Sequence, residues 1–452
     1  MKTYQDLVKV GESDKARIEF VLDAIKEHKK SDEYITAKIA DEYDRKQNRT
    51  IRRYQKLLYT MSGHAVPDNY SANHKTVSGF FPRFVTQQNQ YLLGNGVKME
   101  KNKEKLGKDF DIKLQRLGRS ALVERVSFGF WNYDHLEVFR FLEFVPLWDE
   151  EDGSLKAGVR FWQIDENKPL RATLYEMDGY TELIKRKDKD MVIETAKRAY
   201  TQIKKESAVG GMEIRDGENY PGFPIIPLWA NPHHQSELVG IREAIDCYDL
   251  IKSGFANDID DASMIYWTLE NAGGMDDVDL ARFLERMKTV RAAVVDGDAG
   301  AKAEAHTLNV PYEAREKMLD RIKNDLYEDF QIVDVKQLSS GNKTATEINA
   351  AYEPMNNKVD EFEYCVLDFL LALFEIVGIE DEPSFTRSRI VNQMEETQMV
   401  LMAANYLDDE AILSKLPWIT AEESKEILER MDAESLERTV EEEPIDGVID
   451  NG

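Results

Sequence analysis

Histidines and paired acidic residues are the side chains in this sequence with the chemistry for catalysis or metal binding. The only adjacent histidines, His233-His234, follow a proline, and no His-Glu-x-x-His pattern of a helical zinc site occurs. The acidic pairs Asp260-Asp261 and Asp276-Asp277 could bind a divalent cation, but no oxygen-ligand loop pattern surrounds them. The sequence contains neither a Gly-x-Ser-x-Gly nucleophile elbow nor a phosphate loop ending in Gly-Lys-Ser/Thr. We therefore expect no catalytic residues, no metal site and no cofactor.

The charge balance of the chain restricts its partners. Its 452 residues include 59 Lys and Arg against 85 Asp and Glu, which gives a net charge of −26. A protein that grips nucleic acid by its phosphates usually carries the opposite balance. Two interpretations remain open: charge that keeps the protein monodisperse, or a surface that repels a polyanion passing close by.

The cysteines and the apolar segments indicate the compartment. Cys247 and Cys365 both fall in predicted helices, so we expect no disulfide and a reducing cytosol. The most apolar run, from Tyr364 to Ile379, contains Asp368 and is shorter than the ~20 residues that a membrane span needs. The first fifteen residues are largely polar, which predicts no signal peptide and no membrane contact.

The elements that would position any functional residues centre on 236–379. The apolar periodicity there predicts a helix, a small α/β insert and a second helix. A polar loop, Leu338 to Thr344, and a long helix complete the segment. Thr344 and Glu347 form a capping-box pattern at the start of that long helix. Pro354 lies within its period and predicts a kink or a break.

The first half of the chain predicts an α+β body. Helices are expected at 14–29, from 32 towards 45, and at 110–122. Aromatic residues alternate from Val126 onwards, and the turns 150–153 and Asp178-Gly179 predict an antiparallel meander. Trp131, Trp148 and Trp162 are interpreted as packing residues rather than as a ligand cage.

The remaining segments are predicted to be less regular. The charged stretch 185–205 indicates a loose hairpin or loop, and the proline-rich stretch 220–232 indicates a domain boundary without regular structure. Basic residues cluster between Arg45 and Lys56, either as a solvated helix face or as a contact with an acidic neighbouring subunit or with DNA. Further helices are expected at 387–402 and 410–416, and Thr420 with Glu423 forms a second capping box before a last helix.

This order of parts resembles the portal proteins of tailed double-stranded-DNA bacteriophages. Four stretches carry the resemblance: Tyr91-Leu92-Leu93-Gly94 at a helix end, 128–148 as wing strands, Ser253 to Ala262 in a stem helix, and Ser340 to Ala345 as tunnel loop. The resemblance extends from Tyr34 to Leu428. It departs at Gly96, where the family often has proline, and in a short helical C-terminus that implies a small crown.

The resemblance implies an α+β, mainly helical fold with phage-portal-like architecture. Its parts would be an N-terminal helical arm (1–30), an α+β wing domain (31–235), a stem helix (236–263), a clip domain (264–310), a second stem helix (311–332), a tunnel loop with a long kinked helix (333–379), a helical crown (380–431) and a disordered acidic tail (432–452).

The resemblance also implies a function without enzymatic activity. Portal proteins form a ring, usually a homododecamer, at the capsid portal vertex of the virion, and assemble in the host cytoplasm. The implied partners are double-stranded DNA that passes without sequence specificity, the terminase large subunit, head–tail connector proteins, and capsid and scaffold proteins. The residues expected to face the DNA in the channel are Ser339, Ser340, Gly341, Asn342, Lys343 and Thr344.

Two other classes of function are compatible with the residues alone. Length and ordinary composition also suit a cytosolic α+β enzyme of unknown substrate, or a monomeric interaction scaffold. The only cation of the polar loop, Lys343, could equally be a solvated loop lysine. Light scattering separates the classes, because only a ring-forming protein gives a stable assembly of about a dozen subunits.

Overall fold

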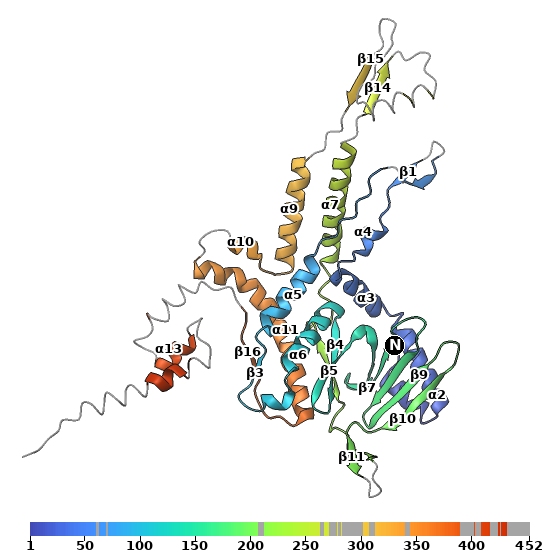
Figure 1. Ribbon diagram of the computed structural model, residues 1–452, viewed down its shortest axis with the longest axis vertical. Helices are drawn as coiled ribbons and strands as arrows, with labels where there is room; N and C mark the ends of the chain where they lie inside the picture. Colours follow the sequence, from blue (N-terminus) through green and yellow to red (C-terminus); the bar gives the residue numbers. More distant parts are fainter. Residues whose placement is uncertain are drawn as a thin grey trace, which may run out of the picture. The chain divides into compact units, whose positions relative to one another are not determined.

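The computed structural model describes residues 1–59, 63–68, 71–206, 212–262, 266–270, 278, 282, 302–306, 312–339, 344–388, 402, 408–415, 424 and 426–431. The chain forms two compact units (Figure 1). The first comprises Met1–Ile332 and Lys358–Thr386, and the second comprises Val333–Asn357 and Arg387–Gly452. The boundary between the two units falls within the long helix Ala345–Val377, three residues after Pro354.

The described helices follow the apolar periodicity of the sequence closely. They are α1 (Tyr4–Val10), α2 (Asp14–His28), α3 (Asp32–Asp44), α4 (Arg49–Arg53), α5 (Phe80–Leu93), α6 (Phe110–Glu124), α7 (Arg242–Ala262), α9 (Tyr312–Asp329), α10 (Val335–Ser339), α11 (Ala345–Val377) and α13 (Asp409–Lys415), with short 3-10 helices η1 (Lys103–Leu106) and η2 (Phe141–Glu143). Residues 389–401 of the helix expected at 387–402, and both residues of the capping box at 420–423, lie outside the described residues. The mixed α+β class is confirmed.

The largest sheet is an antiparallel meander with strands in the order β10-β9-β8-β7-β6. Its strands are β6 (Phe144–Trp148), β7 (Leu155–Trp162), β8 (Leu170–Glu176), β9 (Gly179–Lys185) and β10 (Met191–Arg198). The turns predicted at 150–153 and Asp178-Gly179 both join neighbouring strands. Of the two alternatives for 185–205, a loose hairpin or a loop, the loop is wrong for β10, because Met191 and its neighbours pair with β9 as an antiparallel hairpin and extend the sheet.

A second sheet has the order β13-β4-β5, formed by β4 (Val126–Asn132), β5 (His135–Arg140) and β13 (Ile225–Trp229). The prediction of no regular structure at 220–232 is therefore wrong. Pro227 lies within β13, opposite Phe128 of β4. The strand tolerates this proline because β13 is the edge strand of its sheet. Among the described strands only β4 pairs with it, so no neighbouring strand on the other side requires the missing N–H.

Four pairs of short strands, each strand two to five residues long, complete the described strands. They are β1 (Leu57–Tyr59) with β2 (Ala65–Pro67), β11 (Gln202–Glu206) with β12 (Met212–Asp216), β14 (Tyr266–Glu270) with β15 (Lys302–His306), and β3 (Val97–Lys98) with β16 (Ser384–Phe385).

In the five-stranded sheet, successive side chains along each strand point to opposite faces and therefore pack into two different cores. Val145 and Leu174 face a core that α1 and α2 close with Leu7, Val21 and other apolar residues. The adjacent residues Phe144 and Tyr175 face the other way, into an aromatic core shared with β4 and β5. The five-stranded sheet is thus the middle layer of the body, between two helices and the second sheet. Among the three tryptophans interpreted as packing residues, Trp131 is buried and Trp148 stacks on Trp229.

A tight contact joins this second sheet to α11. A Cβ atom added at Gly129 would lie 2.6 Å from the ring of Phe369, which is itself buried. We expect Gly129→Ala to lower the free energy of unfolding by about 1–3 kcal/mol, because an overpacked core must shift to accommodate the methyl group. Urea unfolding followed by circular dichroism measures the loss.

Gly254 supplies the matched control for this prediction. It lies within α7, and an added Cβ there meets no atom within 4 Å. Gly254→Ala should raise stability by about 0.5–1 kcal/mol, since alanine loses less backbone entropy in a helix. Equal effects of the two substitutions would contradict the packing explanation.

Candidate functional site

The two helices predicted to flank a small insert form an antiparallel pair. Near the C-terminus of α7, Phe255 makes an edge-on ring contact with Tyr312 at the start of α9, with centroids 5.8 Å apart. Asp258 and Arg315 form an ion pair in the same region. Because these contacts join the end of α7 to the start of α9, the insert that holds β14 and β15 leaves from that end of the pair.

The opposite end of the helix pair is anchored in the body by α5. The ring of Phe80 lies edge-on to Tyr248 of α7 at 4.9 Å, and Phe84 contacts Tyr327 of α9 at 5.0 Å. Arg83 donates a hydrogen bond to the Tyr327 hydroxyl at 3.0 Å. The apolar period of the second helix predicts buried Leu319, Ile322, Leu326 and Phe330; the last three are buried at this end, and Leu319 is only half-buried.

Both helices of the pair also carry large apolar side chains that remain uncovered. Leu250 and Ile259 on α7 are 42% and 46% exposed, and Tyr312 and Met318 on α9 are 51% and 44% exposed. The apolar stripe that periodicity predicts for the first helix is thus buried at Ile241 and Ile245 but exposed at Ile259. Exposed apolar residues gathered on one helix pair are typical of a surface that another protein surface covers.

A row of polar side chains on α7 binds an extended segment of the chain. Asp249, Ser253 and Asn257 are spaced by four residues and so lie on one face of the helix. They accept hydrogen bonds from the backbone N–H groups of Ser78 at 2.8 Å, Thr76 at 3.0 Å and His74 at 2.6 Å, in that order.

The spacing of the two partners explains this polar ladder. Four residues of a helix rise about 6 Å, and two residues of an extended chain span about 6.6 Å. Every second N–H of the segment therefore meets one turn of α7. The N–H groups would otherwise lack partners, because an extended segment has no hydrogen bonds of its own.

The ladder continues towards the start of α7 through Asp246, which ties down α3 and α4. Its carboxylate accepts hydrogen bonds from the Tyr43 hydroxyl at 2.5 Å, from Asn48 Nδ2 at 2.9 Å and from the Thr50 hydroxyl at 2.8 Å. Asn48 Nδ2 also reaches the buried Asp249 at 2.9 Å. Burial raises the pKa of Asp249, against the hydrogen bonds from Ser78 and Asn48.

We expect Asp249→Ala to destabilise the body by about 2–3 kcal/mol, because two donors lose a buried acceptor. Amide hydrogen exchange at Ser78 should rise far more than exchange in the five-stranded sheet. The control is Asp260→Ala: Asp260 pairs with His74 at an exposed position, where an ion pair contributes less than about 1 kcal/mol. Unchanged exchange at Ser78 would refute the role of Asp249.

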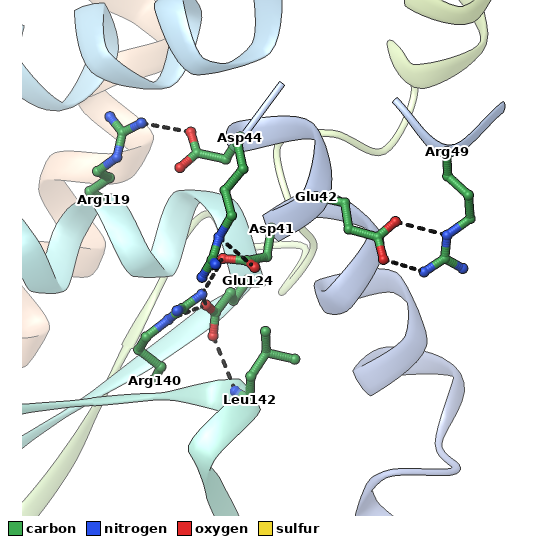
Figure 2. Close-up of polar contacts among 9 residues, drawn as sticks. Asp41, Glu42, Asp44, Arg49, Arg119, Glu124, Arg140 and Leu142 are labelled. Carbon is green, nitrogen blue, oxygen red and sulfur yellow. Dashed lines mark hydrogen bonds and ion pairs between the residues drawn. The ribbon is translucent and has the colours of Figure 1, made fainter. Parts of the chain in front are cut away.

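A second polar cluster crosses from α3 to α6 and β5 (Figure 2). Glu124, at the end of α6, is completely buried. Arg140 Nε donates to its carboxylate at 2.6 Å, and the backbone N–H of Leu142 donates at 3.1 Å. The same guanidinium reaches Asp41 of α3 at 2.5 Å, so one arginine joins three elements.

Burial dominates the electrostatics of this cluster. It raises the pKa of Glu124 to about 7, although Arg140 and the Leu142 N–H act in the opposite direction. For Arg140, burial lowers the pKa, but the carboxylates of Glu124 and Asp41 outweigh it and raise the pKa overall. The arginine is thus charged at all relevant pH values, and Glu124 is the group that can change state.

The predicted loop residues are placed only in part. Ser339 ends α10, and Ser340 to Lys343 lie outside the described residues. The predicted capping box is confirmed: the N–H of Glu347 donates to the Thr344 hydroxyl at 3.3 Å, and the N–H of Thr344 donates to the Glu347 carboxylate at 3.0 Å. Helix α11 continues through Pro354, so a break there is wrong, and a kink stays a prediction.

The sequence patterns did not predict the polar ladder on α7 or the buried Glu124. Polar residues four apart on α7, opposite the apolar stripe, were a usable signal for the ladder. Within the described part of the chain, no group of three or more His, Cys, Asp or Glu side chains could hold a metal ion. None of the helices in that part is long and apolar enough to cross a membrane.

Comparison with known proteins places this chain. Residues 26–437 match the family model described as "Phage portal protein, SPP1 Gp6-like". That match covers most of both units of the structure and the whole helix pair. The chain belongs to this family of phage portal proteins, which are structural components of bacteriophage particles.

Two portal proteins and one solved structure illustrate the likeness. The portal protein of Bacillus phage SPP1 is 22% identical over 475 residues, which cover 92% of this chain and 89% of that protein. The portal protein of Clostridium phage phiCD119 is 27% identical over 218 residues, 46% of this chain and about half (48%) of that relative. A chain of the "Neck of empty GTA particle computed with C6 symmetry" is 11% identical and covers 75% of this chain and 90% of its own length. Its TM-score is 0.42, from which we draw no structural conclusion.

Proposed function

We propose that this protein assembles into a ring of about twelve copies at the portal vertex of a phage capsid, and that double-stranded DNA enters and leaves through the ring. Membership of the portal family supports the proposal. The structural observation that carries it is the helix pair, whose uncovered Leu250, Ile259, Tyr312 and Met318 need a partner surface. Neighbouring copies around a ring would supply that surface.

Charge favours passage of DNA over retention. A net charge of −26 repels phosphate, and a protein that neutralised many phosphates would bind DNA tightly through counterion release. Ser339 to Thr344 offer hydroxyl, amide and backbone groups with a single cation, Lys343, so they would contact a moving backbone without reading bases. We assign this loop to the channel wall.

The proposed partners follow from the same position. At the vertex the ring would contact capsid and scaffold proteins, dock the terminase large subunit during packaging, and later dock head–tail connector proteins. The insert between α7 and α9 would serve as the clip that meets these partners, since it leaves the helix pair at the end away from the body.

The size and symmetry of the purified protein test the proposal. Electron microscopy of single particles should show rings with a central hole, and mass photometry should give about twelve times the 52.1 kDa of the chain. Co-expression with a matching capsid and terminase should then yield DNA-filled particles. A protein that stays monomeric at micromolar concentration would refute the ring.

A further inference from the structure

The part of α11 that belongs to the first unit, from Lys358 onwards, has two very different faces. Its inner face is buried through Phe362, Val366, Phe369 and Leu373. Lys358 anchors the start of this part, with its Nζ 2.6 Å from Glu237 and over the ring of Phe330. The outer face is therefore held in a fixed orientation.

That outer face carries a regular pattern of acidic and apolar residues. Glu361, Asp368 and Glu375 are exposed, lie seven residues apart, and form no ion pair with any described residue. Between them, Tyr364 is 67% exposed and Leu371 is 54% exposed. A spacing of three and four residues places all five on one narrow stripe, the arrangement of a helix seam that receives a partner. We call these five residues the acidic stripe.

A complementary surface lies at the other end of the same unit's sequence, in the basic segment Arg52 to Leu57. Arg52 and Arg53 are exposed, and the hydrogen bond from Arg49, together with the positive charge of Arg53, contributes to a lowered pKa of Glu42 on α3. Tyr54 is 45% exposed and Leu57 is 51% exposed. The segment therefore combines two exposed cations with two uncovered apolar side chains.

The backbone of the basic segment is fixed before any partner binds. The N–H of Tyr54 donates to the carbonyl of Thr50 at 3.0 Å, and Lys75 Nζ donates to the carbonyl of Arg52 at 2.7 Å. A backbone that is already ordered lowers the entropy lost on association. The polar ladder on α7, which holds the chain around Lys75, thus also supports this surface.

We propose that the basic segment of one copy docks on the acidic stripe of the next copy in the ring. A head-to-tail ring needs two different and complementary patches on each chain, and these two have opposite charge and matching apolar content. Arginine–carboxylate pairs set the register, and the aromatic and aliphatic side chains lose their water between them. This interface rests on the proposed ring, and it names the residues that join neighbouring copies.

The experiment reverses two charges on each patch. One variant carries Arg52→Glu with Arg53→Glu, and the other carries Asp368→Lys with Glu375→Lys. Each alone should raise the subunit concentration at half-assembly by at least about tenfold, because like charges then face each other. A variant with all four changes should assemble as the wild type does, as measured by mass photometry over a dilution series.

Mixing the two single-patch variants gives the sharpest result. In an alternating ring every contact between the two kinds of subunit pairs opposite charges, so a 1:1 mixture should assemble although neither variant does alone. The control, Lys187→Glu with Lys189→Glu in the exposed β9–β10 turn, makes the same change in net charge as Arg52→Glu with Arg53→Glu and should leave assembly unchanged. Circular dichroism melts verify folding. Arg52→Gln with Arg53→Gln replaces the basic-segment variant if that fails to fold, and Asp368→Asn with Glu375→Gln replaces the stripe variant.

The outcomes separate this interface from the proposed function. If the wild type forms a ring and either reversal variant assembles as well as the control variant does, the interface is overturned and the ring proposal stands. Recovery in the fourfold variant but not in the mixture would place the contact within one copy and also overturn it. Loss of assembly that neither combination restores would show that the two patches do not pair with each other, and would also overturn the interface. A monomeric wild type would instead refute the ring itself.

Discussion

Replacing Arg140 by methionine is expected to lower the free energy of unfolding by about 3–5 kcal/mol at pH 8, the cost of leaving a buried charge without its partner. Glu124 is fully buried, and Arg140 supplies its only cationic partner in Figure 2. Methionine keeps much of the side-chain volume, so the loss reports on charge more than on packing. Urea unfolding at constant protein concentration measures it.

The pH dependence of this loss follows from the pKa of Glu124. Its carboxyl has a pKa of about 7 in the folded protein, against an ordinary value of 4.5. A pKa that folding raises means that the protonated form favours the folded state. The ionisation cost is therefore absent below pH 4.5 and fully present above pH 7. Without Arg140 the pKa rises further, so the loss in Arg140→Met should be large at pH 8 and much smaller at pH 5.

Glu124→Gln is the matched control, because it keeps the shape and removes the titration. As the pH rises from 4.5 towards 8, the free energy of unfolding of this variant should increase relative to that of the wild type by about 3 kcal/mol. The figure follows from about 1.4 kcal/mol per unit of pKa difference. A loss in Arg140→Met that is equal at pH 5 and pH 8 would show that Glu124 ionisation does not govern this site.

Deleting Gly341 to Lys343 is expected to abolish DNA packaging while ring assembly continues. The deletion removes the proposed channel contact but keeps the Thr344–Glu347 capping box, so α11 retains its N-terminal hydrogen bonds. The basic segment, the acidic stripe and the helix pair are also retained. Counting DNA-filled particles, alongside mass photometry of the ring, measures both effects.

Two comparisons make the packaging result specific. Replacing the same three residues by Gly-Ser-Gly keeps the loop length and removes only the cation and the amide. This variant distinguishes an effect of loop length from an effect of side-chain chemistry. Pro354→Ala tests the predicted kink: a straighter α11 should hinder loop movement and reduce packaging. Loss of ring assembly on deletion would mean that the loop is structural.

Local patterns in the sequence predicted much of the fold. The hairpin turns at 150–153 and Asp178-Gly179 and the capping box at Thr344 each depend on neighbouring residues, and all three are confirmed. The helices α2, α6 and α7 follow from apolar periodicity for the same reason. The family, likewise, follows from the order of short local motifs.

Local patterns failed where a distant partner decides the structure. Pro227 becomes a strand residue only because β4 lies on one side of it, and the charged Met191–Arg198 segment becomes β10 because β9 offers an unpaired edge.

The sequence by itself determined the helices, the hairpins and the family, because each depends on residues close together along the chain. Only the tertiary structure decided the polar ladder, the burial of Glu124 and the position of the acidic stripe. Asp249 and Ser78 are 171 residues apart, and Arg140 and Asp41 are 99 apart. Hydrogen bonds and burial between such residues depend on how the whole body packs, and no short window of sequence contains that information.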